Sequence, residues 1–184
     1  TGGTADYLRG AGLAVKEVSN ITNFPELMDG RLKTLHPYIH GGLLAMRDNK
    51  DHLVSLQKYN IPQIDLLVVN LYPFEKTVTE VKELSEIVEQ IDVGGPAMIR
   101  AAAKNFLSTA IVTEKEDYNE VINEIKKFGG VSLELRKYLA IKAFKKTMHY
   151  DNAIFNWFSS KIIKNKEECL FLEGIKINDL RYGE

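Results

Sequence analysis

An α/β fold, a mostly parallel sheet with helices on both faces, is predicted by two features of this sequence. The runs Ile64–Asn70 and Thr109–Val112 are mainly apolar, which is typical of buried parallel strands. Strand-like and helical segments alternate along the chain without the turn signals of β-hairpins. In such sheets ligands bind beyond the carboxyl ends of the strands, so we expect a functional site in the loops that follow them.

The first third of the chain contains one long segment without periodicity. Residues 19–37 are rich in Asn, Thr, Pro, Gly and charged side chains, which predicts a long loop with a functional role. Helical spacing of apolar residues and glycine stop signals locate the elements around this loop. These are a helix over 5–10, a strand over 13–18 and helices over 41–46 and 52–59.

The second half of the chain predicts mainly helices. Apolar residues recur at helical spacing over 84–91, and Pro96 suits the first position of an alanine-rich helix that runs to Phe106. The tetrapeptide 113–116 matches a capping box, which marks a helix start. One long helix or a broken pair follows over 132–161, with apolar residues on more than one face.

Size and composition limit the class of protein. The 184 residues suffice for one compact domain, and the formal net charge of −1 gives no reason to expect nucleic acid as a partner. Cys169 is the only cysteine, so neither an internal disulfide nor a four-thiolate zinc site can form, which fits a reducing compartment. No apolar run is long enough to span a bilayer, and no signal-peptide pattern is present. We therefore expect a cytoplasmic protein without a membrane partner.

The segment Gly30–Pro37 concentrates groups that bind anions. It carries two cations, Arg31 and Lys33, followed by the hydroxyl of Thr34. If the segment is extended, alternate residues point the same way, so both cations converge while Leu32 turns toward the core. A solvated surface pair is the alternative, and the density of polar groups in a long loop favours the anion site.

Two histidines of this region have a spacing that suits a metal on a helix. His36 and His40 are four residues apart, but Pro37 lies between them and two glycines follow. The favoured alternative is structural, with each ring satisfied by backbone carbonyls or by a ligand. We expect no metal site.

The opening Thr1-Gly2-Gly3-Thr4 is a second anion-binding candidate. Glycines let backbone amides approach an anion closely, with hydroxyls on either side and a helix amino terminus behind them. An ordinary Gly-Gly turn with an N-cap threonine is the favoured alternative when this motif is taken alone, and the cations of the Gly30–Pro37 segment shift the balance. Such a turn ordinarily follows a buried strand, so we expect the fold to lack its first strand.

Asp92 and Lys104 form the sharpest pair of candidate catalytic residues. Asp92 precedes Gly94 and Gly95, whose amides we expect to face a developing oxyanion. Lys104 lies one helix further on, from where its side chain would fold back toward the same loop. A helix-capping carboxylate and a surface lysine are the equally weighted alternatives.

Asn70 and Tyr72 follow the apolar run 64–70 and so lie at the carboxyl end of a predicted strand. Tyr72 stands between Asn70 and Pro73, a placement that favours an exposed hydroxyl. A core aromatic is the alternative.

In this order, the motifs resemble the IMP cyclohydrolase domain of the bifunctional purine-biosynthesis enzymes, which join it to an aminoimidazole-carboxamide formyltransferase. The resemblance implies a methylglyoxal-synthase-like fold over 1–160 that lacks its first strand. It identifies 161–184 as a linker and the truncated start of the formyltransferase domain, because Leu180–Glu184 resembles the opening of that domain. Formyltransferase activity is therefore expected only in a full-length protein.

The implied reaction closes the second ring of a purine. The carboxamide nitrogen of a 5-formamido-imidazole-4-carboxamide ribotide attacks the neighbouring formyl group, and loss of water gives inosine monophosphate. The resemblance implies no metal and no organic cofactor. Its catalytic residues correspond to Asp92 and Lys104, which would manage the carboxamide proton, and to Lys33 and Tyr72, which would stabilise the formyl oxygen. Its phosphate and substrate contacts correspond to Thr1, Gly2, Gly3, Thr4, Arg31, Thr34, Asn70, Gly94 and Gly95.

Three other functions fit parts of the sequence. A methylglyoxal synthase shares the fold and the phosphate loop, but the Lys33 loop and the Asp92 and Lys104 motifs suit a bulkier, aromatic substrate. A regulatory domain of this fold would bind a phosphorylated metabolite without catalysis. A structural fragment would dimerise through the apolar helix over 135–158. That helix has more apolar surface than one neighbour covers, so we expect a homodimer whichever function holds.

Overall fold

The computed structural model of the protein describes residues 2–72, 74–80, 83–163, 174 and 177–182. Within them, the sheet consists of β1 (Leu66–Val68) and β2 (Ala110–Val112), which run parallel with Leu67 opposite Ile111. Backbone hydrogen bonds extend the pairing at both ends, from the amide of residue 110 to the carbonyl of residue 65 (2.8 Å) and from the amide of residue 69 to the carbonyl of residue 112 (3.0 Å). The predicted parallel pairing of the two apolar runs is confirmed.

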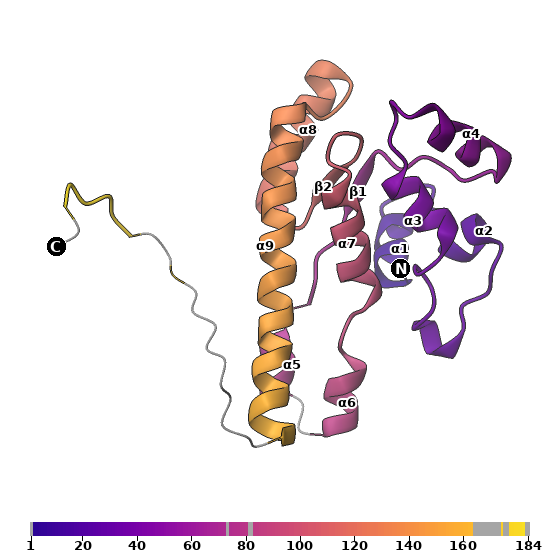
Figure 1. Ribbon diagram of the computed structural model, residues 1–184. Coiled ribbons are helices and arrows are strands. Elements are labelled where there is room, and N and C mark those ends of the chain that lie inside the picture. Colours follow the sequence, from indigo (N-terminus) through magenta and orange to yellow (C-terminus); the bar gives the residue numbers. More distant parts are fainter. Residues whose placement is uncertain (1, 73, 81–82, 164–173, 175–176, 183–184) are drawn as a thin grey trace.

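Helices pack against this sheet, chiefly at β2 (Figure 1). Helices α7 and α9 pack against each other and both contact β2, and α3 packs against α7. This arrangement confirms the predicted α/β fold. The helical elements in chain order are α1 (Gly2–Gly10), α2 (Val18–Thr22), the 3-10 turn η1 (Met28–Gly30), α3 (Pro37–Leu44), α4 (Lys50–Lys58), α5 (Phe74–Glu80), α6 (Leu84–Glu89), α7 (Gly94–Lys104), the 3-10 turn η2 (Lys115–Asp117), α8 (Tyr118–Phe128), α9 (Leu133–Phe158) and the π-helical turn η3 (Ser159–Ile163).

The two strands differ in how they are covered. All three residues of β2 are buried, as expected for a strand between two helical layers. In β1 only Leu67 turns toward the core, whereas Leu66 and Val68 are exposed. The predicted burial of both strands on both faces therefore holds for β2 and is wrong for β1. The physical reason is that the described helices cover only one face of β1.

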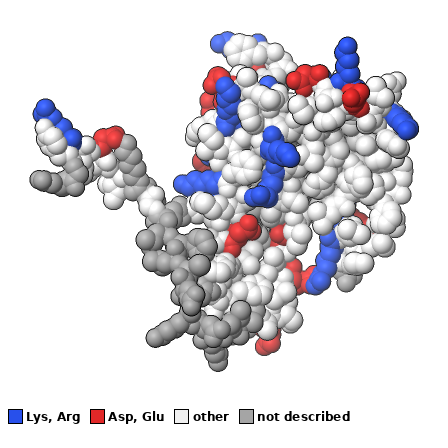
Figure 2. Space-filling view, in the orientation of Figure 1, with Lys and Arg blue, Asp and Glu red and all other residues white. Residues whose placement is uncertain are grey.

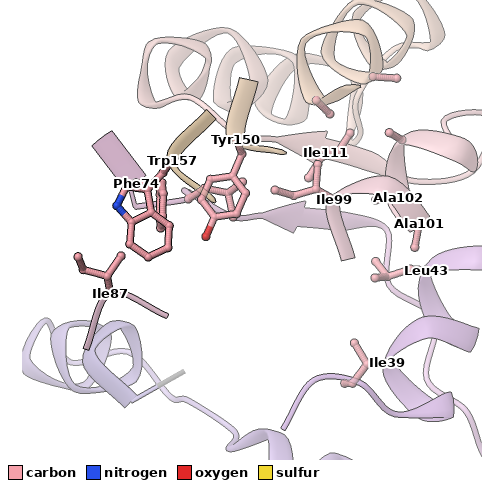
Figure 3. Packing of buried hydrophobic residues seen from close by; sticks show 14 residues of the cluster. Ile39, Leu43, Phe74, Ile87, Ile99, Ala101, Ala102, Ile111, Tyr150 and Trp157 are labelled. Atoms are coloured by element: carbon pink, nitrogen blue, oxygen red, sulfur yellow. The ribbon is translucent and has the colours of Figure 1, made fainter. Parts of the chain in front are cut away.

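The core lies between the sheet and helices α3, α7 and α9. Figure 3 shows the aromatic rings of Tyr150, Trp157 and Phe74 at one end of this cluster and the aliphatic side chains of Ile39 and Leu43 at the other. Trp157 meets Phe74 edge to face with ring centroids 5.8 Å apart, a favourable geometry for aromatic pairs. The carboxyl half of α9 is thereby joined to the start of α5, immediately after the predicted Tyr72 motif.

Buried polar side chains fasten the edge of the sheet where the strands begin. Asn105, at the end of α7, donates its amide hydrogens to the carbonyls of Leu43 (2.8 Å) and Ala45 (3.0 Å). The hydroxyl of Thr109 donates to Leu43 O or to Ile64 O, both 3.2 Å away. These bonds satisfy carbonyls at the end of α3 that would otherwise be buried without partners. They fix α3 and α7 side by side, and both helices start at the opposite edge, where the strands end.

Helix α9 confirms the prediction of a long helix over 132–161 as one unbroken element. The Ser132 hydroxyl caps it by accepting from the amide of Leu135 (3.2 Å). One stripe of its side chains is buried, and on the opposite face Ile141, Met148 and Phe155 recur every seven residues with Ile141 70% exposed. The helix therefore shows apolar side chains on two faces, as the sequence predicts.

The predicted strand over 13–18 is wrong. Residues 13–17 form no strand, Leu13 is exposed, and Val18 begins α2. A strand requires a hydrogen-bonded neighbour, and within the described chain none lies beside this segment. The predicted loop over 19–37 is correspondingly shorter, because it contains α2 and η1 and gives way to α3 at Pro37.

The predicted capping box at 113–116 is also wrong. Thr113, the residue after β2, is buried, and its hydroxyl is without a hydrogen-bond partner in the described structure. The segment turns through η2 before α8 begins at Tyr118. The sequence predicts Pro96 at the first position of this helix, but α7 begins two residues earlier, at Gly94. Pro96 still lies in the first turn, where its missing N–H costs no helical hydrogen bond.

The surface shown in Figure 2 carries interspersed acidic and basic side chains rather than a field of one sign. None of the described helices is both long and apolar enough to span a membrane. Cys169 and most of the predicted linker over 161–184 lie outside the described residues.

Candidate functional site

The segment 31–36 and the start of α7 meet beyond the carboxyl end of β1. The hydroxyl of Thr34 occupies the space that a Cβ atom on Gly94 would need. A Cβ on Gly95 would collide with the carboxylate of Asp92 and would lie 2.9 Å from a methyl carbon of Leu71, the residue that follows β1 closely in the chain. Glycine is therefore required at both positions, because neighbouring atoms leave no room for a Cβ. The sheet edge at which we expected a site brings these predicted residues together.

Asp92 is held by hydrogen bonds at both its side chain and its backbone. Its Oδ1 accepts from the amide of Gly95 (2.9 Å), and its own amide donates to the phenol oxygen of Tyr150 (2.8 Å). The carboxylate thus caps the start of α7, which was one of the two alternatives for this residue, and Asp92 remains exposed to solvent. The Gly95 amide is engaged by Asp92, so the expectation that it faces an oxyanion is not met in this arrangement.

The two cations of the Gly30–Pro37 segment do not converge. Lys33 forms an ion pair with Glu26, and its side chain is only 12% exposed. Arg31 makes two contacts with the carboxylate of Glu89 on α6, one of them from Nε to Oε1 at 3.1 Å. The predicted convergence fails because Arg31 has helical backbone angles (φ −61°, ψ −29°) at the end of η1, and the alternation of an extended segment does not apply.

Two carboxylates near these cations, Glu89 and Glu17, have lowered pKa values. The hydrogen bond from Arg31 lowers the pKa of Glu89 below its ordinary value. The pKa of Glu17 is lowered mainly by its hydrogen bond from Arg9, and Lys33 contributes to the same shift. Lys33 therefore lies within electrostatic reach of the connection between α1 and α2 as well as beside Thr34.

The predicted glycine turn forms the first turn of α1. Gly2, Gly3 and Thr4 are exposed, and no other described group lies within 4 Å of where a Cβ on either glycine would stand. Thr1 lies outside the described residues. Arg9 ties this helix to the following segment through ion pairs with Glu17 and with Asp6 (3.1 Å). The amides of the first helical turn lack partners within the helix, as an anion site requires.

Asn70 and Tyr72 behave differently at the end of β1. Tyr72 is 81% exposed, as the sequence predicts for its hydroxyl. The side chain of Asn70 is engaged twice, because it donates to the carbonyl of Thr113 (3.1 Å) and accepts from the phenol of Tyr118 (2.8 Å). Asn70 thus links the ends of the two strands to α8. Tyr118 is not among the predicted site residues, and no local pattern in the sequence marks this contact.

The structure does not bring Lys104 to Asp92. Lys104 is the last residue of α7 and is exposed, whereas Asp92 lies just before its first turn. With a rise of about 1.5 Å per residue, the length of α7 places roughly 15 Å between the two ends of the helix. Lys104 thus stands at the edge where Asn105 binds the end of α3. The predicted return of its side chain toward the Asp92 loop is not observed.

The histidines have structural contacts. His36 caps α3, and its Nδ1 accepts from the amide of Tyr38 (3.1 Å) rather than binding a carbonyl as expected. His52 accepts from the amide of Met46 (3.1 Å). Burial lowers the pKa of His40, whose buried Nε2 is without a hydrogen-bond partner in the described part of the chain. Among the described residues, no group of three or more His, Cys, Asp or Glu side chains is placed to hold a metal ion.

A separate hollow of about 510 Å³ runs along α8. None of the predicted site residues lines it. Its acidic rim would repel a phosphate, so it is a poor alternative to the sheet edge. The lining residues are Glu116, Asn119, Glu120, Asn123, Glu124, Lys127 and Phe128.

Comparison with known proteins assigns both halves of the chain. Residues 1–97 match the family model of the MGS-like domain, and residues 102–184 match that of the AICARFT/IMPCHase bienzyme. A crystal structure described as that of ForH superimposes with a TM-score of 0.74 at 36% identity, covering 86% of this chain and 83% of that one.

Curated relatives match over the whole chain. The bifunctional purine biosynthesis protein PurH of Bradyrhizobium diazoefficiens is 53% identical over 35% of its own length, and that of Parvibaculum lavamentivorans is 52% identical over 34%. The PurH of a Thermoanaerobacter species is 49% identical over 36% of its length. The chain therefore spans about a third of the length of these relatives. It belongs to the family of MGS-like domains, and the resemblance to the bifunctional purine-biosynthesis enzymes predicted from its motifs is confirmed.

Proposed function

We propose that this chain carries the IMP cyclohydrolase activity of a bifunctional purine-biosynthesis protein. The reaction is the dehydrative ring closure of 5-formamido-imidazole-4-carboxamide ribotide to inosine monophosphate. The observation that carries the proposal is the meeting of Thr34, Asp92 and the Gly94-Gly95 pair at the carboxyl edge of the sheet, in a chain about half identical to PurH. The formyltransferase activity belongs to the full-length protein.

The chemistry requires a group that handles the carboxamide proton. Asp92 meets the requirement of a fixed orientation, because hydrogen bonds hold both its Oδ1 and its backbone amide while the residue stays exposed at the site edge. An ionised carboxylate held in this way can accept the proton of the attacking nitrogen directly or through one water. We assign this role to Asp92.

The formyl oxygen must be stabilised as it becomes a leaving hydroxide. Lys33 and Tyr72 are the cation and the hydroxyl that we assign to it. Lys33 comes immediately before Thr34 and is mostly buried, which strengthens its field on a bound substrate. Lys104 keeps its place in the proposal as a catalytic residue, but its position at the far end of α7 separates its action from that of the Asp92 carboxylate.

The substrate phosphate is assigned to the first turn of α1 and to the segment around Arg31. Gly2, Gly3 and Thr4 offer amides, and Arg31 and Thr34 offer a guanidinium and a hydroxyl. A phosphate at Arg31 has to displace the carboxylate of Glu89, which now holds that guanidinium. Thr1, Asn70 and Gly94 complete the proposed substrate contacts, while the amide of Gly95 is already engaged.

The test is ring closure followed by ultraviolet absorbance in the natural full-length polypeptide. We expect turnover in the wild type, and a loss of at least about a hundredfold in Asp92→Asn, since general acid or base catalysis contributes about that much. Glu116→Gln on η2 is a matched control that should retain activity. A wild-type protein that binds the ribotide without turning it over would overturn the proposal in favour of a regulatory phosphometabolite-binding domain. Formation of methylglyoxal from a triose phosphate would favour the synthase.

We also infer a homodimer in which the outer face of α9 contacts a second copy. Ile141, Met148 and Phe155 form a stripe on this face, seven residues apart, as in helices that pack against a partner helix.

The near-neutral charge and the mixed surface of Figure 2 support a small-molecule substrate rather than nucleic acid. A cytoplasmic location completes the proposal, because the substrate is a soluble ribotide.

A further inference from the structure

Tyr150 lies on α9, 58 residues beyond Asp92 in the chain, yet its phenol oxygen accepts the hydrogen bond from the Asp92 amide at 2.8 Å. The residue is only 7% exposed and belongs to the core cluster. In Figure 3 its ring stands beside Trp157 and Phe74. A buried side chain from a distant helix thus holds the backbone of a proposed catalytic residue.

The ring of Tyr150 also touches the segment that carries Tyr72. It meets Phe74 edge to face, with centroids 6.4 Å apart and planes at 74°. Phe74 is buried and follows Tyr72 by two residues. One phenol therefore contacts two of the segments to which the proposed function assigns catalytic groups, the Asp92 loop through its oxygen and the Tyr72 segment through its ring.

The contact is well suited to orienting the carboxylate. The amide of Asp92 precedes α7 and has no place in the hydrogen-bond pattern of that helix, so its orientation depends on an outside acceptor. Burial raises the pKa of Tyr150, the hydrogen bond from the Asp92 amide opposes this shift, and the charges of Asp92 and Asp151 add to it. The net direction is upward, so the phenol stays neutral at physiological pH. A neutral phenol accepts from an amide without placing a second negative charge beside the carboxylate.

We propose that Tyr150 is a positioning residue for ring closure, which orients the Asp92 carboxylate by holding its backbone and keeps it in register with the Tyr72 loop. This inference rests on the proposed function. It gives α9 a part in the chemistry in addition to its packing. The predicted consequence is that removal of one oxygen atom from α9 impairs turnover, while the apolar contacts of the ring are retained.

The experiment compares Tyr150→Phe with Tyr138→Phe in the natural full-length polypeptide. Both changes remove one phenol oxygen from α9, but Tyr138 is half exposed and far from Asp92 along the helix. We expect Tyr150→Phe to lower kcat about 10- to 100-fold at unchanged KM, since a small displacement of a catalytic group costs about this much. Tyr138→Phe should leave both constants unchanged.

A second pair of variants separates positioning from loss of stability. In an Asp92→Asn background the carboxylate is already gone, so Tyr150→Phe should cause no further loss of kcat. A merely structural role would lower kcat by the same factor in both backgrounds. Equal factors, or a Tyr150→Phe enzyme with wild-type kcat, would overturn the inference while the proposed function stands.

Hydrogen exchange of the Asp92 amide tests the contact without any assay of activity. Tyr150→Phe removes the acceptor, so this amide should exchange faster than in the wild type and in Tyr138→Phe, whereas amides in the middle of α9 keep their protection. An unchanged exchange rate at Asp92 would overturn the inference even if the wild type showed no ring closure, an outcome that would contradict the proposed function separately.

Discussion

Asp92 and Lys104 stand at opposite ends of α7, one before its first turn and the other at its last residue. The separation bears directly on how they act, because two groups that transfer one proton together must be within hydrogen-bond reach of each other or of the same substrate atom. Helix α7 keeps them about 15 Å apart along its axis.

The kinetics of the two single variants and the double variant therefore test this geometry. If the residues act independently, the losses of kcat/KM in Asp92→Ala and Lys104→Ala should multiply in the double variant. We expect multiplication, with Asp92→Ala the more damaging change and Lys126→Ala on α8 as a matched surface control. A double variant no worse than the Asp92 single would show that the two act as a unit and that the site rearranges when substrate binds.

The contact between Thr34 and Gly94 predicts a rescue of stability. A methyl group on Gly94 meets the Thr34 hydroxyl, so Gly94→Ala should lower the free energy of unfolding by about 1–3 kcal/mol, as overpacking does. Thr34→Ala should recover most of this loss in the double variant, measured by urea denaturation. Gly3→Ala is the control, because its Cβ meets open space in a helix, where alanine is favoured by about 0.5–1 kcal/mol. Additive losses in the double variant would contradict the contact.

The pairing of Arg31 with Glu89 predicts opposite effects of two substitutions on nucleotide binding. Arg31→Ala should weaken binding of a purine nucleoside monophosphate by about one to two decades, because a charge-assisted contact is lost. Glu89→Gln should strengthen it, since the phosphate then displaces a neutral amide. Glu86→Gln on the same helix is the control. Calorimetry that finds equal affinity for nucleoside and nucleotide would contradict the assignment of the phosphate to Arg31.

His40 predicts a change of stability with pH. Burial lowers its pKa, so the unfolded chain binds a proton more readily than the folded chain. The free energy of unfolding should therefore fall as the pH drops below the ordinary histidine value of about 6.5. The contribution of neutral His40 should be complete above that pH. His40→Gln should flatten this part of the profile of unfolding free energy against pH. A wild-type profile without this slope would show that the His40 ring is solvated.

The exposed stripe of α9 predicts that a single charged substitution dissociates the proposed dimer. Met148→Glu places a carboxylate in the centre of the stripe and Ile141→Glu at one end, where burial against a second copy is costly. Sedimentation at micromolar concentration should change from dimer to monomer. Ile122→Glu, at an exposed position of α8, should leave the dimer intact. A wild-type monomer at the same concentration would contradict the proposed assembly.

The parallel sheet and the long helix could be predicted because they follow from local patterns. Apolar runs give β1 and β2, and the recurrence of apolar residues gives α9 with its two apolar faces. The strand over 13–18 could not be judged in this way, because an apolar stretch becomes a strand only beside a partner. The burial of β1 likewise depends on what covers it, which no local pattern contains.

The candidate site could be predicted as a set of residues but not as a geometry. The motifs identified Thr34, Asp92 and the Gly94-Gly95 pair, which the structure brings together. The convergence of the two cations was wrong because the backbone of Arg31 is helical rather than extended. The contact of Tyr150 was missed because it joins residues 58 apart, and a tyrosine on a helix carries no signal of which amide it will meet.

The uncovered side of β1 has a practical consequence for anyone who works with this part of the chain alone. Leu66 and Val68 present branched aliphatic side chains to solvent on a strand of only three residues. Apolar side chains exposed on one face of a strand associate with other apolar surfaces, and they do so more readily as concentration rises. Protein limited to these residues should therefore self-associate through β1 and precipitate on concentration. Lysine at position 66 or 68 is the substitution that should keep it in solution.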